Sequence, residues 1–292
     1  MSLDIESIKS KKSISELLKF SIINIDKPSG PTSFQVSQYV KNLFKVNKTS
    51  HFGTLDPQVS GVLPVGLSRA CRLNEVLMHR DKTYVGIMRL HMEVDAQKLK
   101  KTIQKFLGKI QQLPPVRSRV KRAIREREVK TFNILEQDEK DILFETQVQA
   151  GTYIRKLCDD MGKEIGGAHM LELRRTHAGI FEEKTSRNLY EVEQAFKEYQ
   201  QGNEKALRTM LIPGEIVTTL LPCLEIRKDV IKKCLTGSPI FPSFLKNAEK
   251  GNALSGLKKD EFLCVVAEEQ LIGYYRYTGE ETVIARPEFV LN

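Results

Sequence analysis

Short apolar runs separated by polar turns recur through the first half of the chain. Runs at residues 21–25, 62–67 and 83–92 predict strands, because a strand packed between other elements is apolar over several successive residues. Residues 124–135 and 142–148 flank the charged turn D-E-K-D and predict a hairpin. These strands outnumber the helices that could cover them, which indicates an α+β fold with a mixed, largely antiparallel sheet.

Helices are predicted where apolar residues recur every three or four positions. They are expected within residues 1–20, over residues 32–46, around Leu73, Val76 and Leu77, over residues 96–107 and 153–165, and, as one or two helices, within residues 188–209. Thr32 and Ser33 provide the cap of the second helix. Its apolar face is expected to hold Val36, Tyr39, Val40 and Leu43. The helix at 153–165 should end at Gly166 and Gly167.

The pattern changes at Ile212-Pro213-Gly214, where the helical periodicity stops. Beyond it, apolar runs at 263–267, 271–275 and 283–285 alternate with charged turns and predict a small β-barrel. We therefore expect an N-terminal segment, residues 1–20, that packs on another domain, a main domain over 21–211 and a second domain over 212–292.

The length of the chain agrees with two domains, and its charge indicates the kind of partner that it binds. A chain of 292 residues with 40% hydrophobic content is long enough for two domains, each with its own core. The formal charge of +9 favours a polyanionic partner, and nucleic acid is the commonest one, although a basic protein need not bind it.

The cysteines and the apolar runs bear on location. Five scattered cysteines, with no C-x-x-C pair, are typical of a reducing cytoplasm. No apolar run approaches the length of about 18 residues that a membrane helix needs, and the N-terminus lacks the apolar core of a signal peptide. We expect a cytoplasmic protein that neither spans a membrane nor is secreted.

One acidic residue lies in an unusually constrained turn. Residues 49–63 read T-S-H-F-G-T-L-D-P-Q-V-S-G-V-L, and the acid is Asp56. Gly53 and Gly61 can adopt backbone angles that are closed to other residues, and Pro57 fixes φ just after the acid. The turn therefore aims the Asp56 carboxylate. The alternative is an ordinary Asp-Pro turn on the surface.

Three more segments follow one another in the order found in a known protein family. They are I-N-I-D-K-P-S-G-P-T-S at residues 23–33, G-T-Y-I-R-K-L at 151–157 and M-L-E-L-R-R-T-H-A-G-I-F at 170–181. Together with the Asp56 turn, they resemble the TruB family of pseudouridine synthases. The third segment, and the Pro114-Pro115 pair before a basic stretch, resemble the archaeal and eukaryotic dyskerin-type branch, whose members are catalytic subunits of H/ACA guide-RNA particles. The absence of lysine-rich tails fits an archaeal member better.

The resemblance implies a reaction and the residues that perform it. Uridine becomes pseudouridine when the bond from ribose C1′ to N1 breaks, the base rotates and C5 joins the sugar, with no cofactor and no metal. Asp56 would act on C1′ or remove a sugar proton, and Tyr84 would stack on the flipped base and take part in proton transfer. Arg155 would pair with Asp56, favouring its ionised form and fixing its orientation. Alone, Tyr84 would suggest a core aromatic residue and Arg155 a surface charge.

Further residues are implied in substrate binding. Lys27 matches a lysine near the active-site loop, where it would support loop packing or contact phosphate, unless it is a solvated loop lysine. Leu173 matches an apolar residue of the uracil pocket, and Phe34 departs from the family, which commonly has T-S-H there. The basic segment 117–130, which includes Arg119, Lys121 and Arg122, would be a loop that grips substrate RNA. The alternative is a solvated charged strand.

The implied partners are guide RNA, ribosomal RNA and tRNA, together with other H/ACA particle proteins, among them a small zinc-ribbon-type subunit and a kink-turn-binding protein. The region after residue 212 would be a PUA-like domain that holds the guide, whose base pairing reads sequence. Two other hypotheses stay open: a stand-alone TruB-type tRNA enzyme, and a non-catalytic RNA-binding scaffold.

Overall fold

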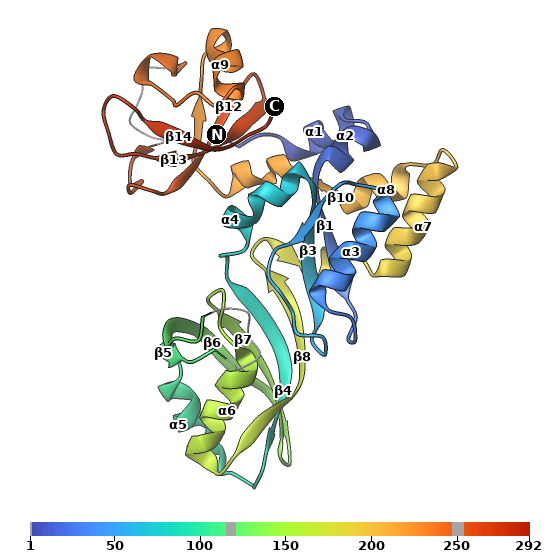
Figure 1. Cartoon of the computed structure of the whole chain (residues 1–292). Coiled ribbons are helices and arrows are strands. Elements are labelled where there is room, and N and C mark those ends of the chain that lie inside the picture. The colour runs from blue at the N-terminus through green and yellow to red at the C-terminus, as the bar shows by residue number, and fades with distance from the viewer. Residues whose placement is uncertain (1, 115–120, 247–253) are drawn as a thin grey trace.

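The computed structural model describes residues 2–114, 121–246 and 254–292. In it, a ten-stranded mixed sheet has the order β10-β1-β3-β8-β4-β7-β6-β5, with β2 paired to β3 and β9 paired to β8 (Figure 1). The strands are β1 Phe20–Lys27, β2 Thr49–His51, β3 Ser60–Ser68, β4 Lys82–Leu90, β5 Gly108–Gln112, β6 Arg125–Asp138, β7 Asp141–Val148, β8 Ala168–Ala178, β9 Phe181–Glu182 and β10 Leu211–Pro213. Within this sheet the described β3–β8 pair is parallel and the other pairs are antiparallel. The expected α+β class with a mixed, largely antiparallel sheet is confirmed.

Helices cover both halves of the sheet. They are α1 Ile5–Lys11, α2 Ile14–Lys19, α3 Ser33–Phe44, α4 Asn74–Leu77, α5 Ala96–Lys105, α6 Ile154–Ile165, α7 Leu189–Gln200, α8 Lys205–Met210 and α9 Ile231–Leu235, with short 3-10 turns at η1 Arg69–Leu73, η2 Glu183–Thr185, η3 Gly214–Thr219, η4 Lys228–Val230 and η5 Pro242–Phe244. Helices α5 and α6 lie beside β4 to β8, while α3 and α7 lie beside β1 and β3, and α8 lies beside β10 (Figure 1). None of the helices in the described part of the chain is long and apolar enough to cross a membrane.

Helix α3 begins where its sequence predicts. The Thr32 side chain accepts a hydrogen bond from Gln35 N while the Gln35 side chain accepts from Thr32 N, a capping box that satisfies backbone donors at the helix start. One expected face residue is wrong: Tyr39 is exposed, and its hydroxyl donates to Glu193 Oε2 at 2.8 Å. The described buried face holds Ser33, Val36, Ser37, Val40 and Phe44.

The strand β8 was not predicted, although it lies in the middle of the large sheet. Its sequence A-H-M-L-E-L-R-R-T-H-A lacks a clean apolar alternation, since several of its residues are polar and Arg175 is buried. Strand β5 was missed too. The strand and helix predictions for the rest of the first half agree with the structure within a few residues, and the segment within residues 1–20 forms two short helices in place of one.

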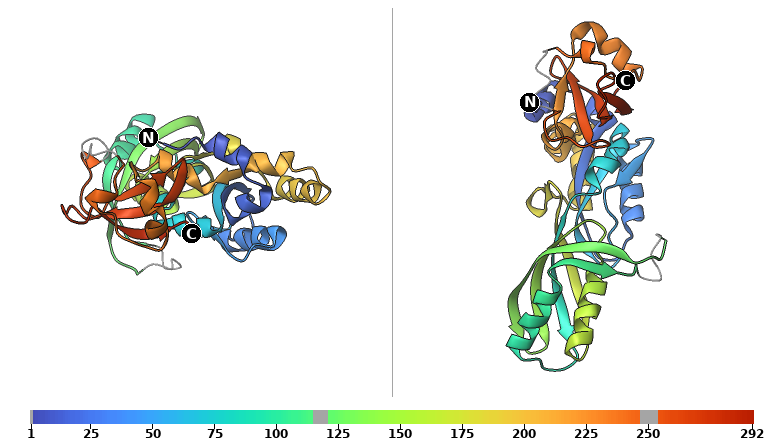
Figure 2. Two further views of the ribbon diagram at one scale, coloured as in Figure 1. Left: turned by 90° about the horizontal axis from the view of Figure 1, so that it is seen from above. Right: turned by 90° about the vertical axis from the view of Figure 1, so that its left-hand side faces the viewer.

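A second, four-stranded sheet follows in the C-terminal region. Its order is β11 Cys223–Glu225, β12 Phe262–Ala267, β13 Gln270–Tyr277 and β14 Ala285–Val290, with β11 and β12 parallel. Since β11 and β14 do not pair in the described part of the chain, the sheet is open and the expected closed barrel is not seen. The run at 283–285 was also misplaced, because the last strand starts at Ala285. Figure 2 shows this sheet at one end of an elongated molecule and the β4–β7 half at the other.

The segments at the proposed boundaries contact the large sheet. Ile212 and Pro213 pair with β1 as part of β10, and the second sheet begins at Cys223. The N-terminal helices are held near the same place: Leu3 N donates to Thr218 Oγ1 at 3.2 Å and Lys12 forms an ion pair with Glu215. The domain limits at residues 20 and 212 stay predictions.

All five cysteines are free and buried.

Candidate active site

Lys27 anchors the turn that contains Asp56. Its side chain is fully buried, and its ammonium donates to the carbonyls of Pro28 at 2.8 Å, Pro57 at 3.0 Å and Val59 at 2.8 Å. Burial lowers the pKa of Lys27, and the nearby Asp56 charge opposes that shift. Of the alternatives in the sequence, loop packing fits this geometry, while the phosphate contact and the solvated lysine do not.

The segment after Lys27 fixes the turn from the other side. Ser33, the first residue of α3, donates to Leu55 O at 3.0 Å and accepts from Leu55 N at 2.8 Å. Gly30 N donates to Pro57 O at 2.9 Å, and Ser29 Oγ to Gln58 O at 3.1 Å. The residues on both sides of Asp56 are therefore held by the loop between β1 and α3, so that two separate sequence motifs build one rigid unit.

Arg175 supports the ends of the same turn. It is 1% exposed, and its guanidinium donates to Val62 O at 2.7 Å and to Gly53 O at 2.9 Å. Gly61 has φ of +102° and lies so close to β8 that a Cβ there would be 2.2 Å from Arg175 O. The positive φ values predicted for Gly53 and Gly61 are thus confirmed, and Gly61 is required for the parallel contact between β3 and β8.

The Asp56 carboxylate meets Arg155 at the surface. Arg155 lies in the first turn of α6, and its Nη2 is 2.7 Å from Asp56 Oδ2. About half of each side chain is exposed, 56% for Arg155 and 51% for Asp56, so both are open to a ligand. The pairing inferred from the family resemblance is therefore present, through one N···O contact.

Tyr84 and Leu173 lie on neighbouring strands beside the turn. Tyr84 on β4 pairs with Arg175 on β8, and Leu173 pairs with Gly86, two residues beyond Tyr84. A Cβ at Gly86 would be 2.8 Å from Leu173 Cδ1, which puts Leu173 on the face of the sheet toward which Tyr84 also points. Both side chains are nearly buried, at 8% and 9% exposure. The strand order β3-β8-β4 thus brings an aromatic and an apolar residue next to the Asp56 turn.

Lys82 is a site residue that the sequence reasoning did not identify. It is 5% exposed, its ammonium donates to Met78 O and Arg80 O, and its side chain lies beside Gly53. Burial, with the charge of Arg175, lowers the pKa of Lys82 to about 8. Lys82 and Arg175 belong to the segments K-T-Y and R-R-T, but periodicity alone cannot show that a charged side chain turns inward. Together with Lys27 they give the turn a positively charged support.

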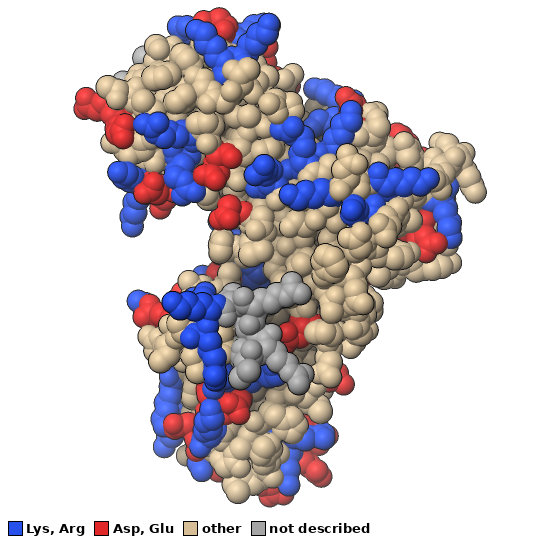
Figure 3. Space-filling model, viewed as in Figure 1, with Lys and Arg blue, Asp and Glu red and all other residues tan. Residues whose placement is uncertain are grey.

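The basic segment is described from residue 121 onward. Lys121 and Arg122 are exposed, and Arg119 lies outside the described residues. Lys130 pairs with Asp81, and Arg127 Nε donates to Gly151 O at 3.1 Å. Figure 3 shows Lys and Arg side chains gathered along the part of the surface where β5 and β6 lie. The exposed cations among them are available to a polyanion.

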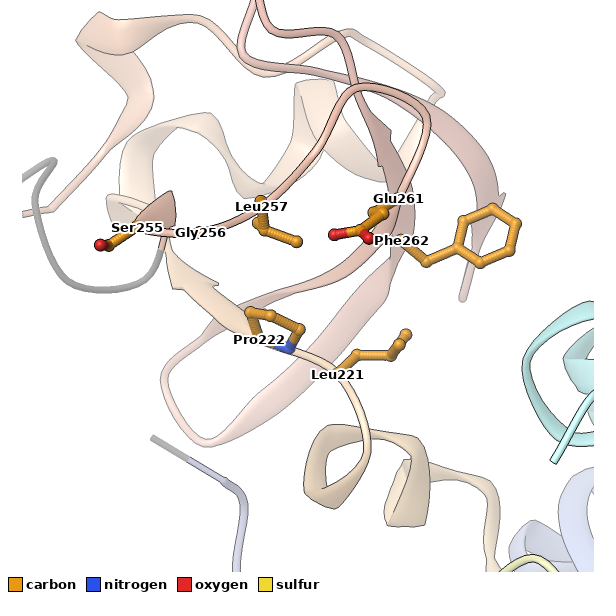
Figure 4. Close-up of a pocket in the computed structure, with 7 residues that line it drawn as sticks. All are labelled: Leu221, Pro222, Ser255, Gly256, Leu257, Glu261 and Phe262. Carbon is orange, nitrogen blue, oxygen red and sulfur yellow. The ribbon is translucent and has the colours of Figure 1, made fainter. Parts of the chain in front are cut away.

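A cavity of about 480 Å³ lies away from this turn, where the chain enters the second sheet (Figure 4). Leu221, Pro222, Leu257 and Phe262 line it, with Glu261 at its side. None of the turn residues contributes to it, so it is not the site of the Asp56 chemistry. No group of three or more His, Cys, Asp or Glu side chains in the described part of the chain could hold a metal ion.

Two family models match the chain. The model described as TruB family pseudouridylate synthase, N terminal domain, matches residues 41–154, and the model described as tRNA pseudouridylate synthase B C-terminal domain matches residues 155–218. The matched regions include Asp56, Tyr84, Arg155 and Leu173. The segment that contains Lys27 precedes them.

Curated relatives match over most of their length. A protein of Methanopyrus kandleri named probable tRNA pseudouridine synthase B is 42% identical over 243 residues, which are 82% of this chain and 72% of the relative. A protein of Thermococcus onnurineus with the same name is 41% identical over 265 residues, 89% of this chain and 78% of the relative.

Solved structures resemble the whole described fold. The chain superimposes with a TM-score of 0.87 on a chain from a Cbf5-Nop10-Gar1 complex, with 32% identity, covering 97% of this chain and 88% of the other. A chain from an H/ACA RNP bound to a substrate RNA containing 2'-deoxyuridine gives 0.85, with 30% identity and coverage of 97% and 89%. These matches include the C-terminal sheet as well as the site.

Proposed function

We propose that this chain, which belongs to the TruB family of pseudouridine synthases and isomerises uridine in RNA, works as the catalytic subunit of a guide-RNA particle. The observation that supports its chemistry best is the Asp56–Arg155 contact of 2.7 Å on a turn anchored by Lys27. A carboxylate held in one orientation by a cation and by a fixed backbone is preorganised for reaction.

Asp56 is the reacting carboxylate in this proposal. It attacks ribose C1′ or removes a sugar proton, so that the bond from C1′ to N1 breaks and the base can rotate. The half-exposed carboxylate is reachable by a nucleotide that has left its stack, whereas the two lysines beneath the turn are not. Arg155 orients Asp56 and keeps its charge in place during turnover.

Tyr84 and Leu173 form the uracil-binding surface. A flipped base needs a flat apolar face for stacking while its glycosidic bond is broken. Tyr84 offers that face, and its hydroxyl is the candidate for handling the C5 proton once C5 has joined the sugar. Leu173 and the small Gly86 leave apolar room on the same side of the sheet.

A particle with guide RNA accounts for the rest of the chain. We assign residues 21–211 to the catalytic domain and 212–292 to a PUA-like domain that holds the guide, since the superposition on chains of H/ACA complexes extends over 97% of this chain. One of those structures is a complex with Nop10 and Gar1, and the other is bound to a substrate RNA. We propose corresponding small-protein partners here, with Arg119, Lys121 and Arg122 on substrate RNA. The buried free cysteines fit a cytoplasmic location.

The second candidate function is guide-independent modification of tRNA. The curated relatives support it, because they are named probable tRNA pseudouridine synthase B. Both functions use the same site, since they differ only in how the target uridine is delivered to Asp56.

Reconstitution separates the two functions. The full chain is incubated with a TΨC-arm stem-loop of tRNA alone, and with a target RNA in the presence and absence of guide RNA and the partner proteins, and pseudouridine is quantified. We expect turnover of the target RNA only with guide. Full-rate turnover of bare tRNA, with no turnover of guide-paired RNA, would favour the stand-alone enzyme. If the Asp56→Asn variant keeps its full function, the chain is instead a non-catalytic RNA-binding scaffold.

A further inference from the structure

A groove of about 290 Å³ lies between α3 and β2, directly before the Asp56 turn. On one side, Phe34, Ser37, Gln38 and Lys41 follow one another along the same face of α3, at the spacing of successive helical turns. On the other side, residues 47–51 lead into β2. The groove is therefore built from regular elements, which hold its walls in fixed positions.

Phe34 is an exposed aromatic ring at one end of this groove. Its side chain is 63% exposed, although the neighbouring Ser33 and Val36 are buried. In a described core where most phenylalanines are buried, an exposed ring beside a groove offers a free flat surface. Such a ring is suited to stacking with a nucleobase, since every base presents a π face.

Two lysines give the groove its charge. Lys41 and Lys48 line it, and in the described part of the chain neither ammonium has a carboxylate within ion-pair distance. The described lining residues also include no acid. The groove thus combines an apolar ring with positive charge that no carboxylate neutralises. This combination is complementary to a nucleotide, which has a flat base and a negative phosphate. A peptide without acidic residues would leave the lysines unpaired.

The groove is connected to the catalytic turn through hydrogen bonds. The hydroxyl of Ser33, the residue before Phe34, donates to Leu55 O and accepts from Leu55 N. At the other wall, His51 Nε2 lies 3.1 Å from Thr54 Oγ1. Both walls of the groove are therefore tied to the residues just before Asp56, which supports placing a nucleotide there that flanks a uridine at Asp56.

We propose that this groove binds a nucleotide that flanks the target uridine, with its base stacked on Phe34 and its phosphate paired with Lys41 and Lys48. The inference rests on the proposed function, since it places the ligand relative to the target uridine. It assigns the groove the task of holding the unpaired strand in register, so that one uridine and not its neighbour reaches Asp56.

The test measures binding, in the Asp56→Asn background so that no turnover intervenes. The full chain is titrated with a fluorescein-labelled TΨC-arm stem-loop and with the guide-paired target RNA, each intact or with one abasic residue at a position flanking the target uridine. Phe34→Ala and Phe34→Tyr test stacking, and Lys41→Gln with Lys48→Gln tests charge. Tyr190→Ala is the matched control, since Tyr190 is an exposed aromatic residue, at 70%, on α7.

We expect Phe34→Ala to weaken binding of the intact RNA about ten-fold, the range of one base–aromatic stack, and Phe34→Tyr and Tyr190→Ala to leave it unchanged. On RNA that is abasic at the contacted position, Phe34→Ala should add almost nothing, because the stacked base is already absent. The lysine double variant should weaken both RNAs alike and flatten the salt dependence.

Other outcomes overturn the inference. Unchanged RNA binding by Phe34→Ala, or an equal loss on intact and abasic RNA, would show that no base stacks there. If Phe34→Ala instead weakens binding of a partner protein and leaves RNA binding intact, the groove is a protein contact. Failure of the proposed function is seen separately, as absence of pseudouridine from the wild-type chain, and the binding measurement still decides the groove.

Discussion

The guanidinium of Arg155 lies 2.7 Å from the carboxylate of Asp56, although the two residues are 99 positions apart in the chain. One is in the first turn of α6 and the other is in the loop before β3. The contact is half exposed, so its strength as a surface ion pair is small and its value lies in orientation. This relationship makes the site testable by single substitutions.

Asp56→Asn should abolish pseudouridine formation and leave RNA affinity within a few-fold. The amide keeps the shape of the side chain and loses the charge that the reaction uses, and loss of a central catalytic group costs on the order of 10³-fold or more in kcat. Single-turnover rates and RNA titrations measure both effects. Glu193→Gln removes another surface carboxylate and is the control. Activity of Asp56→Asn within ten-fold of wild type would exclude the carboxylate role.

Arg155→Met should lower kcat about 10²-fold with little change in KM, because a misplaced catalytic group loses about that much. Arg155→Lys keeps the charge and should recover part of the rate. The control is Arg89→Met, which removes an exposed arginine whose Nη2 contacts Asp141 Oδ2 at 2.5 Å elsewhere on β4. A loss confined to KM would instead assign Arg155 to RNA binding.

Lys27→Met should destabilise the fold as well as the site. The substitution removes the ammonium donor from the carbonyls of Pro28 and Val59, at a cost of about 1–3 kcal/mol for each unsatisfied group, while Pro57 O keeps its hydrogen bond from Gly30 N. Urea unfolding gives the free energy, and Lys184→Met, at an exposed ion pair with Glu182, is the control. Equal unfolding free energies for the wild type and Lys27→Met would show that Lys27 does not anchor the turn.

Lys82 should make stability depend on alkaline pH. The pKa of Lys82 is about 8 in the folded protein and 10.5 in its usual state. Between pH 8 and pH 10.5 the unfolded chain therefore binds more protons at Lys82 than the folded protein does. The free energy of unfolding contributed by Lys82 thus rises as the pH rises through this range. Relative to Lys82→Met, the wild type should gain about 2 kcal/mol between pH 7 and pH 10.

Parallel urea titrations at several pH values measure that difference. Lys228→Met is the matched control, because Glu268 raises the pKa of the exposed Lys228, and its contribution should be constant from pH 7 to pH 9. A wild-type advantage that does not change with pH would place the Lys82 ammonium in water, and one that shrinks as the pH rises would show that the fold stabilises its charge.

Replacing Arg119, Lys121 and Arg122 together by Gln should weaken substrate RNA binding and reduce the slope of log K against log salt by about 2, since three phosphate contacts on a single strand release that many counterions. Guide retention should change less. A control with the same charge change uses Lys184, Lys197 and Lys205. Equal losses for guide and substrate with an unchanged slope would identify the segment as a solvated strand.

Local pattern was sufficient for most elements and for the choice of glycine at the bends of the Asp56 turn. The capping of α3 and the end of α6 at Gly166 each depend on residues within a few positions of one another, and the sequence predicts them. It also predicts the positive φ of Gly53 and Gly61, although the contact that requires glycine at position 61 is with β8 across the sheet. The motifs also identified Asp56, Tyr84 and Arg155 as candidates, because the residue types and their order match a known family. Their catalytic roles stay predictions.

Long-range contacts decided the rest. Burial of Lys27 depends on carbonyls about 30 residues away, and burial of Arg175 depends on Gly53 and Val62 across the sheet, so neither side chain's environment is encoded in its own neighbours. Strand β8 was missed because strand pairing on both sides compensates for its weak apolar pattern. The pairing of Arg155 with Asp56 likewise exists only because the fold brings α6 to the turn, since Coulomb attraction acts through space and not along the chain.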